Sequence, residues 1–182
     1  ALAPNNMVLR LADAKLRALS GQIVDLSTIG TPTNDGERIA YAEALMSQNK
    51  FDEASQQFST LIANAPDAKQ TFAVADLALM LKDLPSAESA YNKAKTFPGY
   101  ENRAKRGMVK IAKTKEESRK HLTMARDLTR KGQHNSSVDQ YRATIFDDPK
   151  NAAARLELAE TIQKQARPDS EMMKDVAQQY RA

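Results

Sequence analysis

The sequence predicts an all-α fold in which antiparallel helix pairs stack on one another, and three observations support this prediction. The composition favours helix over strand, because Leu, Ala, Lys, Glu and Gln are frequent while Val and Ile are sparse and only 6 of 182 residues are Gly. Apolar residues recur at intervals of three and four, which is the period of one helix face. The same pattern of small and aromatic residues returns after 33 to 34 positions.

The segment DEASQQFSTLIANAPD, residues 52–67, shows the repeating unit. Ala54, Phe58 and Leu61 are three or four residues apart and therefore share one helix face. Pro66 follows them as a helix stop signal. The amphipathic run DGERIAYAEALMSQ precedes this helix, and NKF alone joins the two. The two helices must therefore fold back on each other as an antiparallel pair.

The pair recurs in residues 68–98 and 118–149, and residues 152–182 begin a further unit. Helix axes in contact approach to about 8–10 Å, so only a small side chain fits where two helices of a pair cross. The residues expected at the crossing are Ala42, Ala75, Ala125 and Ala159 in the first helices. The small residues that recur in the second helices are Ala54, Ala87 and Ser137. The aromatic residues expected to fill the space beside them are Phe58, Tyr91 and Tyr141.

These residues, with the closing prolines Pro66 and Pro149, resemble the tetratricopeptide repeat family over most of residues 35–166. The resemblance implies a right-handed solenoid of antiparallel helix pairs with about four full or partial repeats. The sequence departs from the family at Arg38, Thr71, His121 and Arg155, where the family usually has Trp or Leu. In the last unit the segment PDSEMMKDVAQQY keeps only the pattern of Met172, Val176 and Tyr180.

We therefore expect a single solenoid domain made of six segments. They are a degenerate or truncated repeat (1–34), two repeats (35–67 and 68–99), an extra basic helix (100–117), a third repeat (118–151) and a partial repeat (152–182). The first segment should hold a helix, MVLRLADAKLRAL, and a short second one, QIVDLSTI, ending at Pro32. The opening APNN is similar to the ends of the later repeats, so we interpret the chain as a piece of a longer solenoid.

The extra helix near residues 100–113 disturbs the alternation of first and second helices. Tyr100, Ala104, Met108 and Ile111 form its apolar stripe, and Gly107 lies in the small-residue region. Thr114 and Glu117 have the spacing of a capping box, which predicts that a new helix starts there. Strict alternation would make 115–131 a second helix, whereas the repeat motif makes it a first helix, and the sequence leaves both assignments open.

The sequence offers no catalytic constellation, so we predict a protein that is not an enzyme and uses no cofactor or metal. Cys is absent, and no Gly-rich phosphate loop, HExxH or GxSxG motif occurs. We interpret His121 as a packing residue, His134 as a turn residue, and Asp147 and Asp148 as a helix-end turn. No nucleophile, base and orienting group come together.

The resemblance implies that a partner segment lies in a concave groove lined by the outward positions of the first helices. Those positions are Ile39, Glu43, Met46 and Ser47; Phe72, Asp76, Leu79 and Met80; Leu122, Arg126, Thr129 and Arg130; and Leu156, Glu160, Gln163 and Lys164. We expect apolar contact from Phe72, Leu79 and Met80 and carboxylate binding by Arg126 and Arg130. The alternative is that Phe72 and Leu79 only pack between repeats. Ile39 and Glu43 stand where some members have a Lys/Asn carboxylate clamp, so a chaperone-tail adaptor is not expected.

The positive charge is concentrated in one part of the chain. The net charge is +4 overall, and residues 100–133 contain 11 basic and 4 acidic residues. We expect a basic surface formed by Arg103, Lys105, Arg106, Lys110, Lys113, Arg119 and Lys120. It is interpreted first as a solvated helix face and second as a docking site for an acidic protein. Nucleic acid is disfavoured because no aromatic residue is interleaved after Tyr100, whereas peripheral membrane association stays open.

The first functional hypothesis is a non-catalytic scaffold or adaptor that binds a segment of another protein, in the assembly of a bacterial envelope, pilus or secretion complex. The alternatives are an interaction module excised from a larger enzyme or transport protein, and a basic-surface binder of nucleic acid or anionic membrane. No apolar run reaches the roughly 18 residues of a membrane span. Homo-oligomerisation is open, and periplasm and cytoplasm are both compatible with the sequence.

Overall fold

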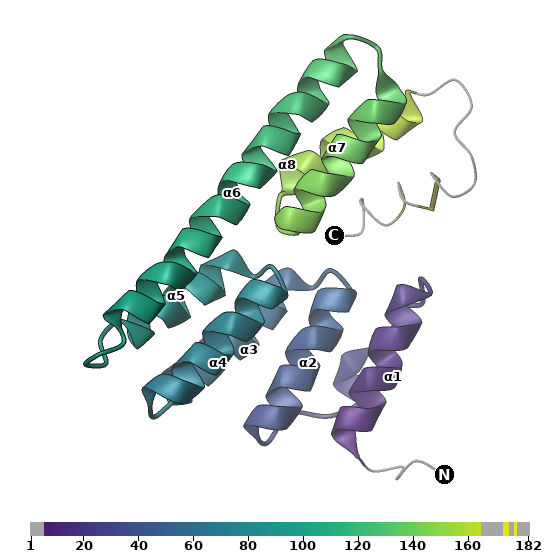
Figure 1. Ribbon diagram of the computed structural model, residues 1–182. Coiled ribbons are helices and arrows are strands. Elements are labelled where there is room, and N and C mark those ends of the chain that lie inside the picture. The colour runs from purple at the N-terminus through teal and green to yellow at the C-terminus, as the bar shows by residue number, and fades with distance from the viewer. Residues whose placement is uncertain (1–5, 165–172, 175–176, 178–182) are drawn as a thin grey trace. The chain divides into compact units, whose positions relative to one another are not determined.

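The computed structural model describes residues 6–164, 173–174 and 177, and all regular structure in these residues is helical (Figure 1). The elements are α1 (Met7–Leu19), a 3-10 turn η1 (Leu26–Thr28), α2 (Asp35–Ser47), α3 (Phe51–Asn64), α4 (Ala68–Met80), α5 (Leu84–Ala94), α6 (Glu101–Arg130), α7 (His134–Asp147) and α8 (Ala152–Gln163). The prediction of an all-α fold built from helix pairs is confirmed. The chain divides into two units, residues 1–107 (unit 1) and 108–182 (unit 2), which are described separately.

Short polar side chains set the starts of several helices. The Oδ1 atom of Asn34 accepts a hydrogen bond from the backbone N–H of Glu37 at 3.0 Å. The Glu37 carboxylate in turn accepts from the backbone N–H of Thr33 at 2.7 Å. Asp67 and Asn151 cap α4 and α8 with their side-chain oxygens in the same way. These bonds satisfy N–H groups that have no partner within the helix and so fix where each helix begins.

One residue in a left-handed conformation closes each tight turn between the two helices of a pair. These residues are Asn49 between α2 and α3, Lys82 between α4 and α5, and Gly132 between α6 and α7, with φ of 61°, 62° and 71°. Only Gly adopts this conformation freely, and a residue with a Cβ atom pays roughly 1–2 kcal/mol. The three turns therefore share one geometry although their sequences differ.

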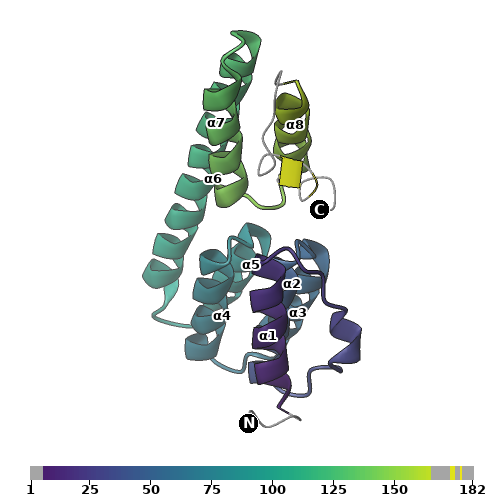
Figure 2. The same cartoon turned by 90° about the vertical axis from the view of Figure 1, so that its right-hand side faces the viewer.

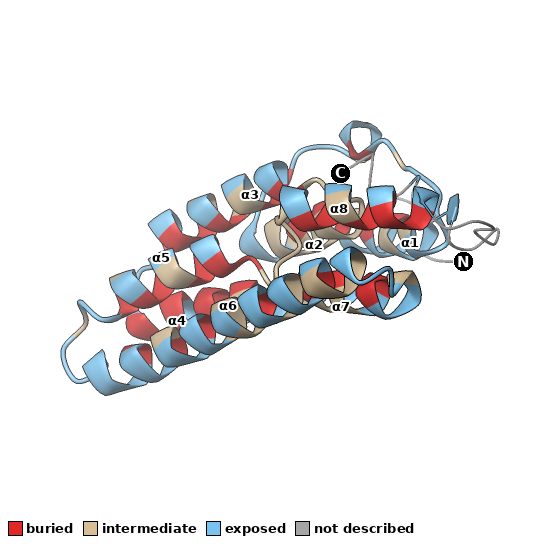
Figure 3. Ribbon diagram, turned by 90° about the horizontal axis from the view of Figure 1, so that it is seen from above, coloured by how far each residue is buried: buried red, intermediate tan, exposed pale blue. Residues whose placement is uncertain are grey.

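In unit 1 the predicted small residues lie in the core. All four are fully buried: Ala42, Ala54, Ala75 and Ala87. The aromatic residues Phe58 and Tyr91 are buried as well. Figure 3 shows the buried positions along one side of the helices and the exposed positions on the opposite side. The recurring small residues are thus core positions, which is what close packing of the two helices of a pair requires.

Lys93 of α5 connects the two repeats of unit 1. Its Nζ atom donates to the backbone oxygens of Ile62, Ala63 and Ala65, at 2.5, 3.2 and 2.9 Å. These carbonyls lie at the C-terminus of α3, where backbone oxygens lack partners within the helix and negative potential accumulates. The ammonium group therefore caps α3 from the neighbouring repeat.

The first segment is a repeat with a reduced second helix. α1 spans the predicted residues, but QIVDLSTI forms only the 3-10 turn η1. Leu11 and Ala14 of α1 pack with Leu26 of η1 and with Ala44 and Leu45 of α2 in one buried cluster. A single turn with one buried leucine thus takes the place of a whole second helix.

The expected start of a new helix at Thr114 is wrong, because α6 runs unbroken from residue 101 to residue 130. The capping-box pair lies in the helix interior. No Gly or Pro follows Gly107 until the turn after the helix, so nothing in the sequence breaks the backbone pattern. Ion pairs between Lys113 and Glu117 and between Lys120 and Glu116, at 3.7 and 3.6 Å, support this polar stretch from within the helix.

The second half of α6 is a first helix, as the repeat motif predicted, because it pairs with α7 (Figure 2). The hydroxyl of Ser118 donates to the Thr144 carbonyl at 3.4 Å. Near the other end of the pair, the hydroxyls of Thr129 and Ser137 are 2.5 Å apart. This contact is the one that the repeat motif predicts when residues 115–131 act as a first helix. The first turns of α6 belong to unit 1, where Gly107 lies against Tyr91 of α5.

Unit 2 repeats the core of unit 1 with α6, α7 and α8. Its buried cluster consists of Ala125, Val138, Tyr141, Ala154, Leu158, Ala159 and Ile162. Ala125, Ala159 and Ser137 are fully buried at their predicted positions. The predicted pattern of Met172, Val176 and Tyr180 lies outside the described residues.

The polar residues that replace the family's usual Trp or Leu make specific bonds. The four are Arg38, Thr71, His121 and Arg155. Arg38 donates to the Gln57 side chain at 3.1 Å, and Nδ1 of His121 lies 2.8 Å from the Gln140 side-chain oxygen. Each Gln directly precedes the aromatic residue of its second helix. Thr71 and Arg155 instead donate to backbone carbonyls. In the repeats of Arg38 and His121, a polar bridge between the two helices of the pair therefore stands where the family usually has an apolar side chain.

Gly107→Ala should destabilise the protein by about 1–3 kcal/mol in a denaturant titration, as overpacking in a core does. A Cβ atom at this buried position would overlap the ring of Tyr91, which is itself buried. This clash outweighs the roughly 1 kcal/mol that Ala contributes over Gly in a helix.

The Tyr91→Ala background serves as the control, since it removes every ring atom that the added Cβ atom would overlap. In that background Gly107→Ala should be neutral or stabilising. An equal cost in both backgrounds would show that the ring does not exclude the methyl group.

Candidate protein-binding face

One charged residue follows the crossing alanine of each first helix, and in α1 the corresponding buried alanine is Ala14. These post-alanine residues are Lys15, Glu43, Asp76, Arg126 and Glu160. The preceding alanines are buried, whereas each post-alanine residue is at least partly exposed. All five are charged, and four of them belong to the predicted groove. They therefore form the polar part of the candidate site.

In unit 1 the post-alanine residues bind to the neighbouring first helix. Nζ of Lys15 in α1 is 2.8 Å from Oε2 of Glu43 in α2. Nη2 of Arg103, in the first turn of α6, is 3.5 Å from Oδ2 of Asp76 in α4. Opposite charges thus connect consecutive first helices, and Glu43 and Asp76 are already engaged within the chain.

In unit 2 the corresponding bond is a two-pronged ion pair. Nε and Nη2 of Arg126 in α6 donate to the Glu157 carboxylate of α8, at 2.9 Å and 2.6 Å in the closest contacts. The hydrogen bonds from Arg126 are the main cause that lowers the pKa of Glu157, and Glu157 raises the pKa of Arg126. Arg126 was predicted to bind a partner's carboxylate, and here it holds a carboxylate of its own chain.

The second-helix tyrosines extend these ion pairs into hydrogen-bonded triads. The Tyr91 hydroxyl donates to Oδ1 of Asp76 at 2.5 Å, and the Tyr141 hydroxyl donates to Oε2 of Glu157 at 2.9 Å. Burial is the first cause that raises the pKa of both tyrosines. Each unit therefore contains one Tyr–carboxylate–Arg triad that joins three helices.

Phe72 is not available to a partner, because it is fully buried in unit 1. Its ring centroid lies 6.1 Å from that of Tyr91 and 5.7 Å from that of Tyr100. The guanidinium of Arg103 lies over the ring, 4.2 Å from its centroid. Phe72 therefore packs inside unit 1, in agreement with the alternative interpretation of the sequence.

The other predicted groove residues divide into two groups. The exposed positions are Met80, with 66% of its surface accessible, Leu156, Glu160, Gln163 and Lys164. Arg130 is exposed too, but it is bonded to Asp127. The partly buried positions are Ile39, Met46, Ser47, Leu79, Leu122 and Thr129. Met46 packs against the α1–α2 cluster and Leu122 against the unit 2 cluster. Unit 1 therefore exposes apolar atoms at the C-terminal end of α4, next to bonded charges.

The predicted basic surface is partly neutralised within the chain. Arg103 is bound to Asp76, Lys113 to Glu117, and both Arg119 and Lys120 approach Glu116. The remaining members, Lys105, Arg106 and Lys110, are exposed. These pairs reduce the positive charge that the sequence count suggests for this helix.

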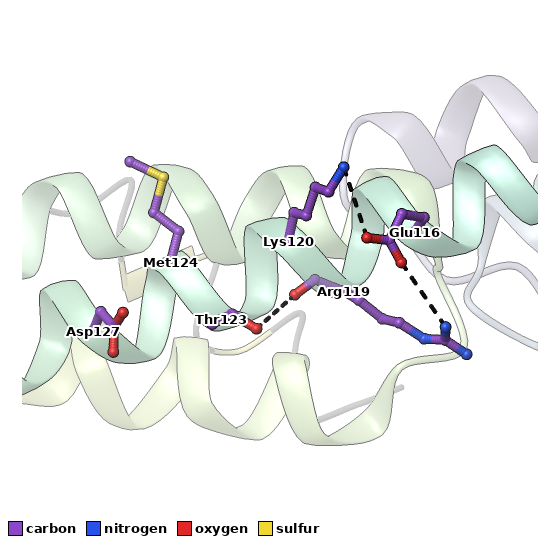
Figure 4. A pocket seen from close by; sticks show the side chains of 6 residues that line it. All are labelled: Glu116, Arg119, Lys120, Thr123, Met124 and Asp127. Atoms are coloured by element: carbon purple, nitrogen blue, oxygen red, sulfur yellow. Dashed lines mark hydrogen bonds and ion pairs between the residues drawn. The ribbon is translucent and has the colours of Figure 1, made fainter.

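A small depression lies on the exposed side of α6 (Figure 4). Its lining consists of Glu116, Arg119, Lys120, Thr123, Met124 and Asp127. Figure 4 shows the Glu116 carboxylate between the ends of Lys120 and Arg119, while the Thr123 hydroxyl donates to the Arg119 carbonyl. Since one helix supplies the entire lining, the depression is an open surface feature rather than an enclosed site.

The two histidines and the Asp147–Asp148 pair, which were considered as functional candidates in the sequence, occupy packing or helix-end positions. Nε2 of His121 lies 4.0 Å from the Asp147 carboxylate, and His134 is the first residue of α7. Asp147 ends α7, as predicted, and Asp148 follows as its C-cap. In the described part of the chain, no three His, Asp or Glu side chains gather so that they could hold a metal ion. Across the same residues, no helix combines the length and the apolar character needed to cross a bilayer.

Buried alanines at helix crossings, repeated helix pairs and bonds between consecutive first helices define a helical-repeat protein. A family model described as Tetratricopeptide repeat matches residues 40–101 and 122–168, more than half of the chain. The chain belongs to the tetratricopeptide repeat family. Repeats of this family generally mediate protein–protein interaction and are typically non-catalytic. No curated protein and no solved structure matches the chain.

The bonds between first helices were not predicted, although the sequence carries a signal for one of them. Lys15 and Glu43 have opposite charge and both follow the crossing alanine of their helix. Comparing the charge at this position in consecutive repeats would have indicated the pair. Arg103 and Glu157 do not follow a crossing alanine, so this comparison would have missed their bonds.

Glu157→Gln should lower the free energy of unfolding at neutral pH by about 1 kcal/mol, because the ion pair with Arg126 is partly exposed. The pKa of Glu157 is lower in the folded protein, so this stabilisation is present above its ordinary value of about 4.5. It is lost as the pH falls through the depressed value. The difference between wild type and variant should therefore shrink in urea titrations at decreasing pH.

Glu116→Gln is the matched control, since within the described residues its ion-pair partners, Arg119 and Lys120, are exposed and lie on its own helix. It should change stability by less than about 0.5 kcal/mol at any pH. A Glu157→Gln cost that stays constant through the acid range would argue against a stabilising carboxylate at this position.

Proposed function

We propose that this protein is a non-catalytic scaffold or adaptor that binds a segment of another protein along its first helices. Membership of the tetratricopeptide repeat family carries the proposal. Assembly of a bacterial envelope, pilus or secretion complex is the process we propose for it, on the strength of its composition. The binding residues are those of the predicted groove that keep exposed surface.

Ion pairs within the chain limit the kind of partner that the first helices can bind. Glu43, Asp76 and Arg126 already bind partners within the chain. A ligand that relied on these charges would have to break existing ion pairs. Exposed apolar atoms at Met80 in α4, and part of Met46 in α2, offer contact without that cost. Met side chains also adapt their shape to different surfaces. The partner segment is therefore expected to contact unit 1 mainly through apolar side chains.

The basic part of α6 is expected to contribute less to partner binding than the exposed apolar atoms. Several of its cations are paired with Glu116 or Glu117. Binding to nucleic acid or anionic membrane would depend on counterion release and therefore fall steeply with salt. A partner held by apolar contact would lose little affinity over the same salt range.

The double substitution Met46→Ser/Met80→Ser should weaken binding of a selected peptide at least tenfold, about 1.4 kcal/mol. Peptides would be selected from a displayed random library on the immobilised protein, and their dissociation constants measured by calorimetry. The loss is expected because both changes remove apolar surface from the first helices of unit 1.

Ile23→Ser is the control, because Ile23 is as exposed as Met80 (68% and 66%) but lies outside the first helices. It should leave the dissociation constant unchanged. Equal binding by all three proteins would contradict use of this face. Salt-sensitive binding to duplex DNA or phosphatidylserine vesicles, with no selectable peptide, would favour the basic surface instead.

A further inference from the structure

Arg103, in the first turn of α6, is held in unit 1 by a buried aromatic ring. Its guanidinium lies 4.2 Å from the ring centroid of Phe72, whose side chain is fully buried. The ring of Tyr100 lies beside Phe72, with 5.7 Å between the two centroids. A cation over an aromatic face is attracted to the ring, which limits the rotamers that the arginine adopts. The guanidinium is therefore held in place before any partner arrives.

Arg103 keeps donors that can bind a ligand. A guanidinium has five N–H donors. Within the described residues this one makes a single hydrogen bond, from Nη2 to Oδ2 of Asp76 at 3.5 Å, which is longer than a typical N–H···O bond and therefore weak. The Arg103 side chain is 50% exposed, so a ligand can reach its other donors. A planar fork of this kind is suited to a carboxylate, which accepts two parallel hydrogen bonds.

The charges around Arg103 favour an acidic ligand over a basic one. The Asp76 carboxylate is already engaged by the Tyr91 hydroxyl as well as by Arg103. Arg106 lies three residues after Arg103, so it shares that side of α6, and it is exposed. Glu101 lies two residues before Arg103 and therefore on another side of the helix. Two cations thus stand against one carboxylate in this part of unit 1.

Arg103 is close to the apolar surface that the proposed function uses. Asp76, its ion-pair partner, and Met80 are four residues apart and both exposed, so their Cβ atoms are about 5–6 Å apart on one face of α4. Side chains two positions apart on an extended peptide point the same way and are separated by about 6–7 Å. One extended segment can therefore place an apolar side chain on Met80 and a carboxylate at Arg103.

We propose that Arg103 binds a carboxylate of the partner segment while Met80 contacts an apolar side chain two residues away. The inference rests on the proposed function and names the chemistry that a partner of the same face must carry. The Lys/Asn clamp positions lie three residues before and one residue after the small residue of a first helix, whereas Arg103 lies four residues before Gly107. The carboxylate comes from an acidic side chain of the segment or from its C-terminus.

The first test changes the ligand and leaves the protein untouched, so misfolding cannot account for a loss of affinity. Peptides selected from the displayed library on the wild-type protein serve as probes. Each is synthesised in one version with its acidic side chains replaced by the corresponding amides, and in another with its C-terminus amidated. One of the two versions should raise the dissociation constant about fivefold, which identifies the source of the carboxylate.

The second test changes the protein. Arg103→Gln should weaken binding of the unmodified peptide by a similar factor, and it should make the amide version bind no worse than the original, because the two groups no longer meet. Arg103→Lys keeps the charge but not the planar fork, so its affinity should lie between those of wild type and Arg103→Gln. Lys105→Gln is the control, since it removes the same charge from an exposed residue of the same helix that lies on another side. It should change the dissociation constant by less than about twofold.

Three outcomes would count against these proposals, and they differ from one another. Equal losses with Arg103→Gln and Lys105→Gln would show that only general positive charge matters, and would overturn the inference. Peptides that depend on Met80 but bind equally well in both amide versions would overturn it too, while leaving the proposed function intact. A library that yields no peptide sensitive to Met46→Ser/Met80→Ser would count against the proposed function itself, and with it against this inference.

Discussion

The whole structure depends on close approach of two helices at a position that admits no large side chain. Ala42, Ala75, Ala125 and Ala159 occupy this position in successive first helices, and each is fully buried. The close crossing opens space beside it for the second-helix aromatic residue, which packs and donates a hydrogen bond where it is a tyrosine. It also directs the next residue of the first helix outward, toward the neighbouring repeat. One steric constraint thus places the core, the aromatic residue and the bonds between repeats.

This constraint explains why much of the fold could be predicted from the sequence. A small residue that recurs at a fixed interval can be recognised in the sequence even when the exact ends of the helices are not known. The pairing of α2 with α3 and of α4 with α5 was therefore predictable. The continuity of α6 was not. Thr114 and Glu117 have capping-box spacing, but a cap forms only if the preceding backbone leaves the helix, and nothing in the neighbouring sequence forces it to. In the same way, QIVDLSTI has enough apolar residues for a helix, yet one buried leucine in a 3-10 turn fills the space.

The candidate site was less predictable, because position on a helix does not decide whether a side chain is available. Phe72 occupies an outward position of the repeat, but two neighbouring tyrosines and Arg103 enclose it. Asp76 and Arg126 are exposed enough to meet a ligand, and both are held by partners far away in the sequence. Whether two such residues form a bond depends on the positions of their side chains on neighbouring helices. The spacing of residues in the sequence does not give these positions. The repeat pattern does predict which helices carry the proposed binding surface, namely the first helices.

Lys93 shows how one amine can join two repeats. Its three bonds replace backbone partners that the end of α3 lacks, and they use all three protons of the ammonium group. Acetylation of this amine would remove both the charge and two of the three donors. The last carbonyls of α3 would then lose the partner that the adjacent repeat supplies. A lysine-modifying enzyme or reagent that reached this side chain would therefore loosen the joint between the two hairpins while leaving each hairpin's own crossing intact.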